Sequence, residues 1–461
     1  MLNLPTVPAG WKQTLKRTLF FDQDPSPELF AILAVYFVQG ILGLARLGVS
    51  FFLKDDLHLS PAAVAAMAGI ASLPWVVKPL FGFLSDSLPI LGYRRRSYLV
   101  LSGILGCLAW LAMATVVNSA FAATVAIALS STSVAISDVI ADSIVVERIR
   151  SKESQSDAGS LQSLCWATTA LGGLVTAYAS GWLLEHLSTR SLFLITATFP
   201  LIVCAIASFI IEAKVSTPPN LKTTKHQISE LRDTITQPQI LLPVLFVFLW
   251  QSTPNSESAF FFFTTNDLGF NPEFLGRVRL VTSLASLLGI WLFQRFFKAV
   301  AIRTIFLWST LLSSALGLTT LLLVTHANRS LGIDDHWFSL GDSLILTVMG
   351  QIAYMPVLVL AARLCPPGIE ATMFALLMSI LNLGGLLSHE SGALLMHQLG
   401  VTESNFQNLW LLVTITNLST LLPLPLLHWL PQKSSELEQM NVMSFPIDNP
   451  ETVETTVSLS P

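Results

Sequence analysis

The chain alternates long apolar blocks with short polar connections, and this pattern constrains the fold more than any other feature. Each block is roughly 20 residues long, which is the length of an α-helix that crosses the hydrocarbon core of a bilayer. Lipid leaves backbone polar groups without water, so a spanning block of this kind must be helical. The sequence therefore predicts an all-α polytopic membrane protein with twelve transmembrane helices, near residues 28–53, 61–84, 98–117, 120–147, 161–183, 191–211, 239–263, 274–297, 302–324, 340–363, 371–396 and 408–430.

Polar stretches divide the twelve blocks into two groups of six. The stretch between the sixth and seventh blocks is the longest internal one and carries the pair Pro218-Pro219. We expect each group of six to form its own bundle. The predicted organisation is an N-terminal segment (1–27), a first bundle (28–211), a central loop (212–238), a second bundle (239–430) and a C-terminal tail (431–461), whose Ser, Thr, Glu and Pro content predicts disorder.

Lysine and arginine residues set the predicted orientation, because cationic loops are retained on the cytoplasmic side during insertion. Most of the 25 Lys and Arg residues lie in the N-terminal segment, the even-numbered connections and the tail. Both termini are therefore predicted to be cytoplasmic. The odd-numbered connections hold only Lys54, Arg190, Arg277, Arg279 and Arg329.

The composition excludes several classes of protein. Only 12% of the residues are charged, about half the share of a soluble domain. The net charge of -4 is small, and the acidic residues gather in loops and the tail, which is not the footprint of a nucleic-acid-binding protein. The four cysteines show no CxxC or paired spacing, so we expect no metal site. No phosphate-loop, HExxH, GxSxG or dinucleotide motif is present, so we expect no cofactor and no enzymatic activity.

The two groups of six resemble each other at equivalent positions. Leu171-Gly172-Gly173 in the fifth block, followed by Ser180-Gly181, matches Leu383-Gly384-Gly385 in the eleventh, followed by Ser391-Gly392. This match favours two pseudo-symmetric bundles, as in transporters whose repeats rock around a shared site. The alternative is that small residues merely permit close helix packing.

The stretch from Gly82 to Arg96, at the predicted cytoplasmic end of the second block, is the most specific local signal. Its carboxylate Asp86, its Gly92 and its basic run resemble the loop motif of the major facilitator superfamily. The resemblance implies a gate in which Asp86 pairs with an arginine or accepts backbone hydrogen bonds. Cationic anchors at helix ends are the alternative. The predicted gating residues are Lys78, Asp86, Arg94, Arg95, Glu147, Arg148 and Arg363.

Several ionisable side chains lie at membrane depth, where each costs about 2.5 to 3.5 kcal/mol and therefore faces a cavity or a partner. Asp138 and Asp142 are four residues apart, hence on one helix face, and repel each other. An ion pair of these carboxylates with Arg46 or Lys78 that only positions helices is one interpretation. The other assigns substrate binding to Arg46, Asp138 and Asp142, and proton coupling to Asp138, Asp142 and Glu257.

Two further blocks contain polar residues that suit the wall of a wet cavity. The seventh block carries a polar run from Trp250 to Glu257 that includes Pro254, which is expensive in lipid. His389 and Glu390 in the eleventh block are either interhelical hydrogen-bond partners or a proton relay. The predicted substrate contacts from these regions and the tenth block are Trp250, Gln251, Asn255, Gln351 and Tyr354.

A narrower resemblance is densest between residues 36 and 103. The segments Tyr36-Phe-Val-Gln-Gly40, Pro74-Trp75-Val-Val-Lys78-Pro79 and Ser137-Asp138-Val-Ile-Ala-Asp142 are similar to those of the folate-biopterin transporter family, a branch of the major facilitator superfamily. The resemblance implies uptake of folates or related pterins. It also implies that the first, fourth, seventh and tenth helices line the central cavity, where most of the residues above fall.

The predicted function is secondary active transport of folates or pterins by alternating access, coupled to protons. Moving a dianion inward against an inside-negative potential costs about 2.3 kcal/mol per charge per 100 mV, so accumulation requires co-transported cations. The alternatives are a carrier of another organic anion or polar metabolite, and a transporter-like receptor without flux. We expect a monomer in a bacterial, cyanobacterial-like inner membrane, with the plastid envelope as the alternative.

Overall fold

The computed structural model describes residues 26–150, 155–210, 212, 214, 236–297, 300–363 and 370–431. Within these ranges the side chains of 146–150, 155–163, 166, 359, 361–363 and 370–374 lie outside the description. The predicted N-terminal segment, most of the predicted central loop and the predicted C-terminal tail also lie outside the described residues. The described chain is helical, with one isolated bridge between Ile90 and Tyr93 and no strand.

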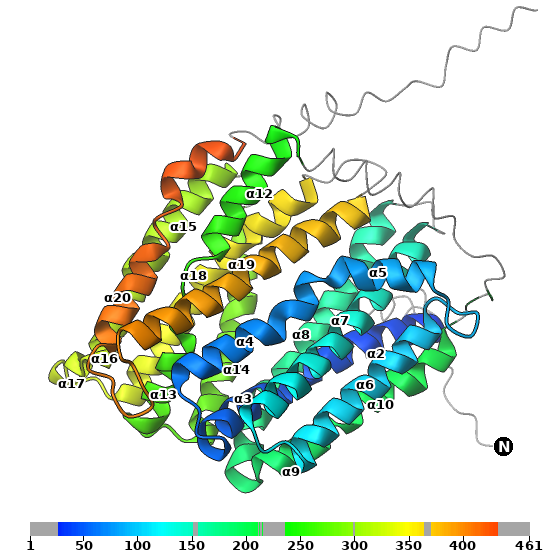
Figure 1. The fold of residues 1–461 in the computed structure, drawn as a ribbon. Coiled ribbons are helices and arrows are strands. Elements are labelled where there is room, and N and C mark those ends of the chain that lie inside the picture. The colour runs from blue at the N-terminus through cyan, green and yellow to red at the C-terminus, as the bar shows by residue number, and fades with distance from the viewer. Residues whose placement is uncertain are drawn as a thin grey trace, which may run out of the picture.

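Helices fill both halves of the chain (Figure 1). The first half contains α2 (Pro27–Ile41), α3 (Leu44–Phe51), η1 (Phe52–Asp56), α4 (Pro61–Val76), α5 (Lys78–Ser87), α6 (Arg96–Thr115), α7 (Ala120–Arg150), α8 (Gln155–His186), α9 (Thr189–Thr196), α10 (Thr198–Ile206) and η2 (Ala207–Phe209). The second half contains α12 (Pro238–Gln251), α13 (Glu257–Asn266), α14 (Pro272–Leu292), η3 (Phe293–Phe297), α15 (Ile302–Gly317), α16 (Thr320–Val324), α17 (Ala327–Ser330), α18 (Asp335–Arg363), α19 (Glu370–Gln398), α20 (Leu409–Ser419) and η4 (Leu424–Trp429).

Many of these elements join into segments long enough to cross a bilayer. Nine segments of the described chain are long and apolar enough to do so. The long helices α8 and α19 and the broken pair α12–α13 complete a set of twelve. The predicted all-α architecture of twelve spans in two bundles of six is therefore confirmed.

Several spans begin with a side-chain N-cap that is followed directly by a proline. The side chains of Ser26, Ser60 and Asn271 each accept a hydrogen bond from a backbone N–H in the first turn of α2, α4 and α14, at 3.1, 3.3 and 2.9 Å. A proline follows each of these caps. Proline suits the first helical position because its missing N–H would have no partner there. These caps fix the first residues of the first, second and eighth spans.

Several predicted spans are broken rather than continuous. The first bends between α2 and α3 at Leu42 and Gly43, and the second between α4 and α5 at Val77. The seventh is interrupted from Ser252 to Ser256, beside Pro254. A hydropathy profile reports the length and apolar content of a segment, and it does not detect a short break in the helix.

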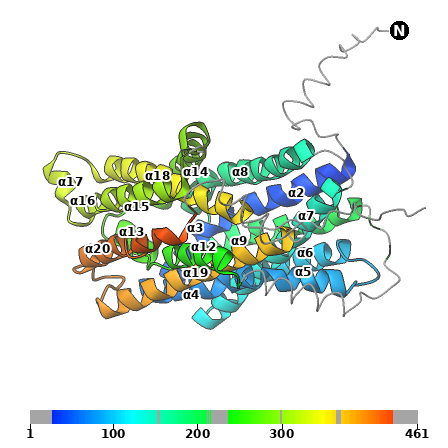
Figure 2. The ribbon, with the colours of Figure 1, turned by 90° about the horizontal axis from the view of Figure 1, so that it is seen from above.

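The two bundles meet along two seams, which Figures 1 and 2 show from perpendicular directions: α4 lies against α19, and α8 lies against α14. Within each bundle the matched glycines lie at corresponding contacts. A side chain on Gly172 of α8 would clash with α2, and one on Gly384 of α19 would press on Gln251 of α12. The fifth span thus packs closely on the first, as the eleventh packs on the seventh.

Candidate functional site

Four polar side chains meet inside the first bundle, and we call them the carboxylate cluster: Tyr36, Lys78, Asp138 and Asp142. The Lys78 ammonium forms an ion pair with Asp138 of α7 and lies 4.0 Å from Oδ2 of Asp142, one turn further along. The Tyr36 hydroxyl of α2 donates a hydrogen bond of 2.5 Å to Oδ1 of Asp142. The structure thus joins two predicted substrate residues to a lysine that the sequence assigned to the gate.

Lys78 reaches this cluster because the chain breaks immediately before it. Pro79 has no N–H to donate and its ring clashes with the preceding turn. Helix α4 accordingly ends at Val76 and α5 begins at Lys78. The Lys78 ammonium also lies 5.1 Å from the ring centre of Trp75, a cation–π contact. The Pro-Trp-Val-Val-Lys-Pro segment therefore builds both the break and the surroundings of the cation.

The cluster holds two carboxylates and one ammonium, so its formal charge is negative when both acids are ionised. Lys78 and Asp138 are largely buried, at 15% and 14% side-chain exposure, whereas Asp142 is 46% exposed. An ionised carboxylate accepts hydrogen bonds, and a protonated one can donate. Asp142 is therefore the member open to a ligand with hydrogen-bond donors, or to a proton.

A cavity of about 300 Å³ lies inside the second bundle, at the break between α12 and α13. Trp250, Gln251 and Asn255, all predicted from sequence, lie in its wall. The Trp250 indole donates to Thr310 Oγ1 at 3.2 Å, and Asn255 Nδ2 donates to Ser388 Oγ at 3.1 Å. Every lining side chain is uncharged. This cavity therefore suits neutral hydrogen-bonding groups or ordered water.

Three other predicted residues of the second bundle lie away from that cavity. Gln351 packs against Gly289 of α14, and Tyr354 packs against the apolar core of the bundle. Glu257 is exposed at the first residue of α13. In the described part of the chain, none of these three lines the cavity. The structure therefore does not bring the eight predicted substrate residues into a single pocket.

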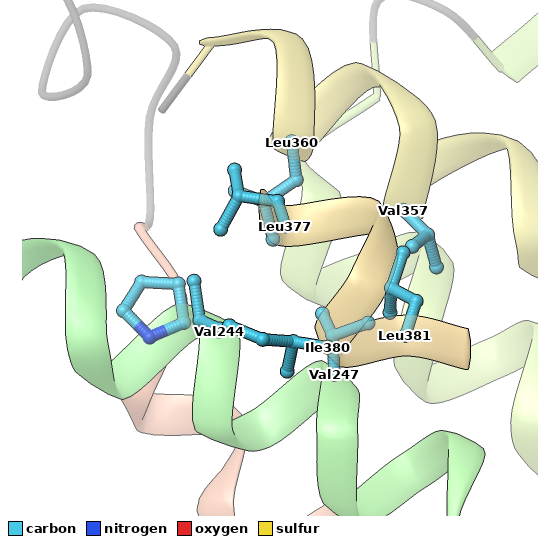
Figure 3. A pocket seen from close by; sticks show the side chains of 8 residues that line it. Val244, Val247, Val357, Leu360, Leu377, Ile380 and Leu381 are labelled. Carbon is cyan, nitrogen blue, oxygen red and sulfur yellow. The ribbon is translucent and has the colours of Figure 1, made fainter. Parts of the chain in front are cut away.

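A second, smaller pocket between α12, α18 and α19 is entirely apolar (Figure 3). Its volume is only about 20 Å³, room for a single water molecule. Val244, Val357 and Leu381 are among the side chains that point into it. It has no group that could recognise a polar substrate.

The predicted gate motif is held together within the first bundle. Arg95 Nη2 lies 2.9 Å from Oδ1 of Asp86, and Arg95 Nη1 donates to Ser85 Oγ at 3.0 Å. The turn that joins the two residues has positive φ at Leu91 (55°) and Gly92 (84°), a conformation that glycine adopts without strain. The side chains of three further predicted gate residues lie outside the described part of the chain: Glu147, Arg148 and Arg363.

A carboxylate from beyond the sixth span clamps this loop. Glu212 accepts hydrogen bonds from the backbone N–H groups of Arg94, Arg95 and Arg96, at 2.5, 3.1 and 3.0 Å. These N–H groups open α6, where a negative charge is stabilised by the helix dipole. Arg94 Nε is buried and has no partner among the described residues. Glu212 thus fixes the gate loop against the end of the first bundle.

The His389-Glu390 pair of α19 faces two different neighbours. His389 Nδ1 lies 3.3 Å from Asn255 Nδ2, beside the cavity of the second bundle. The Glu390 side chain packs against Gly69 of α4, across a seam between the bundles. The two residues therefore do not share one partner.

Arg279 of the second bundle reaches the turn of the first span from which Arg46 also leaves. Arg46 is exposed on α3, as the sequence placed it in the first span. Arg279, counted from sequence with the outward loops, lies about two turns inside α14. Its guanidinium donates to Ser180 Oγ at 2.9 Å and to the carbonyl oxygen of Gly43 at 3.1 Å.

The sequence missed three residues that contact predicted ones. Tyr36 appeared only as part of a family segment, and its position in the first span gave no sign of its bond to Asp142. Glu212 is separated from the gate motif by more than a hundred residues. Arg279 lies close to a predicted boundary, so charge counting placed it in a loop. In each case the signal was a charged or hydroxyl group near a span, without a partner visible in sequence.

Side-chain contacts between the bundles are present near the end of α3 and in the middle of the second span in the described part of the chain. Phe51 and Phe261 meet edge to face at 5.3 Å, and Lys54 donates to Asn266 at 2.9 Å. Nearer the middle, Asn382 donates to the carbonyl oxygen of Trp75 at 3.2 Å. The two bundles are therefore joined by direct side-chain contacts at these levels of the spans.

Comparison with known proteins places this arrangement in a family. The model of the BT1 family matches residues 39–444. The chain is 58% identical over 440 residues to the "Folate-biopterin transporter" of Synechocystis sp., covering 95% of this chain and 88% of the relative. It is 31% identical over 407 residues to "Folate transporter 2" of Plasmodium falciparum, covering 88% and 89%.

A solved structure supports the fold. The nucleoside transporter NupG superposes with a TM-score of 0.66 at 14% sequence identity, covering 88% of this chain and 99% of that one. At this identity the likeness bears on the fold alone, and it confirms the predicted major facilitator architecture. The family match over residues 39–444 and the 58% identity to the Synechocystis relative establish that the chain belongs to the BT1 family.

Proposed function

We propose that this protein is a secondary active transporter that moves folates or related pterins across the membrane by alternating access. The observation that carries the proposal is the carboxylate cluster, in which a partly exposed Asp142 is held by Tyr36 and Lys78. The relationship to a Synechocystis folate-biopterin transporter supports the substrate class.

The chemistry of a folate fits the predicted residues. Its pterin edge presents N–H donors, which Asp138 and Asp142 can accept, and its carboxylates call for a cation such as Arg46. Its rings can stack on aromatic faces. The remaining predicted contacts are Trp250, Gln251, Asn255, Gln351 and Tyr354.

We further propose that transport is coupled to protons at the carboxylate cluster. Because the cluster has one more carboxylate than ammonium, a single proton on Asp138 or Asp142 neutralises it formally. A proton carried inward with the folate offsets one of its negative charges, and each net charge moved against the potential costs about 2.3 kcal/mol per 100 mV. Glu257, exposed at the start of α13, is the second candidate for proton uptake.

The proposed moving units are the two bundles, residues 28–211 and 239–430. Closure of the cytoplasmic side would involve Lys78, Asp86, Arg94, Arg95, Glu147, Arg148 and Arg363. The positive residues on the even-numbered connections support cytoplasmic termini. We place the protein as a monomer in a bacterial inner membrane, in keeping with its cyanobacterial relative.

The test is uptake of labelled folic acid into cells that lack their own folate transport, at matched membrane expression. We expect accumulation of the label by the parent and no accumulation by Asp142→Asn or Arg46→Ala. Glu185→Gln, which removes an exposed carboxylate from α8, serves as the control and should transport normally. Absence of uptake by the well-expressed parent would refute the folate assignment.

A further inference from the structure

Two arginines from opposite bundles meet at one turn of the first span. Arg279 of α14 donates to the carbonyl oxygen of Gly43 at 3.1 Å, and the backbone N–H of Arg46 donates to the same oxygen at 3.2 Å. The Arg46 side chain is exposed and leaves α3 from this same turn. The two arginines therefore form a pair of like charges, which we call the arginine pair.

Within the described part of the chain, no carboxylate neutralises the arginine pair. The partners of Arg279 are neutral, namely Ser180 Oγ and the Gly43 carbonyl. No ion pair involves Arg46 or Arg279 among the described residues. Two unneutralised charges at membrane depth are costly and repel each other. An anion between them would remove both penalties.

A second observation on the same span points to a ligand. The Nε2 amide of Gln39 is buried and has no acceptor among the described residues. Gln39 lies one turn before Gly43 and about two turns before Arg46, on the same face of α2 and α3. A buried amide donor without a partner costs free energy unless a ligand or water accepts from it.

The same face also carries Tyr36, whose hydroxyl binds Asp142 in the carboxylate cluster. At 1.5 Å per residue, Tyr36 and Arg46 are about 15 Å apart along the helix axis. The face thus runs from an acidic end, past an unpartnered donor at Gln39, to a cationic end. An extended ligand with donors on a flat ring at one end and carboxylates at the other matches this order.

We propose that Arg46 and Arg279 form the anion-binding end of the substrate site and hold the carboxylates of the amino-acid tail of a folate, with Gln39 donating to its central carbonyl. This inference rests on the proposed folate transport and adds Arg279, a residue of the second bundle, to the site. A guanidinium binds a carboxylate through two parallel hydrogen bonds, which gives geometric selectivity as well as charge. Because the two arginines belong to different bundles, the bound anion would link the bundles at this level.

The test compares two probes on the purified full-length protein: folic acid, and its diamide, in which both glutamate carboxylates are capped as neutral amides. The parent should bind folic acid at least tenfold more tightly than the diamide. Arg279→Gln should bring the two affinities within about twofold of each other by weakening folic acid alone, since the diamide makes no charge contact with the guanidinium. A purely structural role for Arg279 would weaken both probes equally.

Arg277→Gln is the matched control. Arg277 lies on the same helix, two residues away, but is 58% exposed and paired with Glu273 at 2.7 Å. This variant should keep the parent's selectivity for folic acid. Should Arg279→Gln fail to accumulate in the membrane, Arg46→Gln carries the same measurement, because its side chain is exposed and its removal leaves the bonds of Arg279 in place.

The outcomes separate the two proposals. Equal affinity of the parent for both probes, or unchanged selectivity in Arg279→Gln, would overturn the arginine-pair site and leave folate transport standing. A parent that binds neither probe would overturn the folate substrate and this inference together. Loss of selectivity in Arg279→Gln with selectivity kept in Arg277→Gln would establish the site.

Discussion

Lys78 forms an ion pair with Asp138 across the interior of the first bundle, joining the start of α5 to the middle of α7. Both side chains are largely buried. A buried pair of this kind is far more sensitive to the loss of one partner than to the loss of both, because a lone buried charge has no compensation.

The single variant Lys78→Met should therefore destabilise the protein by about 3 to 5 kcal/mol, since it leaves two carboxylates without a cation. The double variant Lys78→Met with Asp138→Leu should recover most of that stability and remain inactive. Unfolding midpoints in detergent and uptake assays on the same preparations would measure both. If the double variant is as unstable as the single one, the pair is not the source of the loss.

Asp142→Asn should separate exchange from accumulation. The amide keeps the shape of a protonated carboxyl group and accepts the Tyr36 hydroxyl, but it cannot release a proton. We expect exchange of labelled for unlabelled folate across proteoliposomes, with no accumulation in response to an imposed pH gradient. In the parent, a protonophore should abolish accumulation and spare exchange. Accumulation by Asp142→Asn at the parental level would remove Asp142 from proton coupling.

Glu212→Ala should loosen the gate loop. It removes a carboxylate that accepts three backbone N–H groups at the start of α6, and leaving such donors unpaired costs about 1 to 3 kcal/mol. We expect a lower unfolding midpoint and faster tryptic cleavage at Arg94–Arg96 from the cytoplasmic side. The exposed Glu185→Gln should change neither quantity. Unaltered cleavage in Glu212→Ala would argue against the clamp.

Gly276→Val should prevent the close packing of α14 on α8 that joins the two bundles. A Cβ atom at Gly276 would lie 2.9 Å from the Gly181 Cα and 3.0 Å from the Tyr178 carbonyl oxygen, both backbone atoms that cannot move aside. The variant should fold, lose uptake, and show greater labelling of a cysteine introduced at Ser50 by an impermeant thiol reagent added outside. Gly173→Ala on α8 meets nothing within 4 Å and should behave as the parent.

The sequence predicted the spans well because hydropathy and length are local properties. It predicted the breaks less well: the polar run around Pro254 was visible, yet it was read as part of one continuous helix. The sequence did not predict which side chains form pairs. Asp138 and Asp142 share a face by spacing alone, but the choice of Lys78 over Arg46 as their partner depends on the direction in which α5 leaves the break at Val77. That direction is a tertiary property.

Arg279 and Glu212 also have partners that the sequence could not predict. Both lie within a few residues of a predicted boundary, where a shift of one turn moves a charge from a loop into the interior. Charge counting therefore assigned Arg279 to orientation, and Glu212 to the edge of a loop. The positions of their partners, Gly43 and the backbone of α6, are set by how distant spans pack together.

The contacts that join the two bundles should depend little on ionic strength. In the described part of the chain, no ion pair crosses between the bundles; the crossing hydrogen bonds all have a neutral group on at least one side. Salt screens opposite charges over a Debye length of about 8 Å at physiological concentration and leaves such bonds and close glycine contacts largely unaffected. These contacts should therefore hold the two bundles together with nearly the same strength in fresh and in saline surroundings.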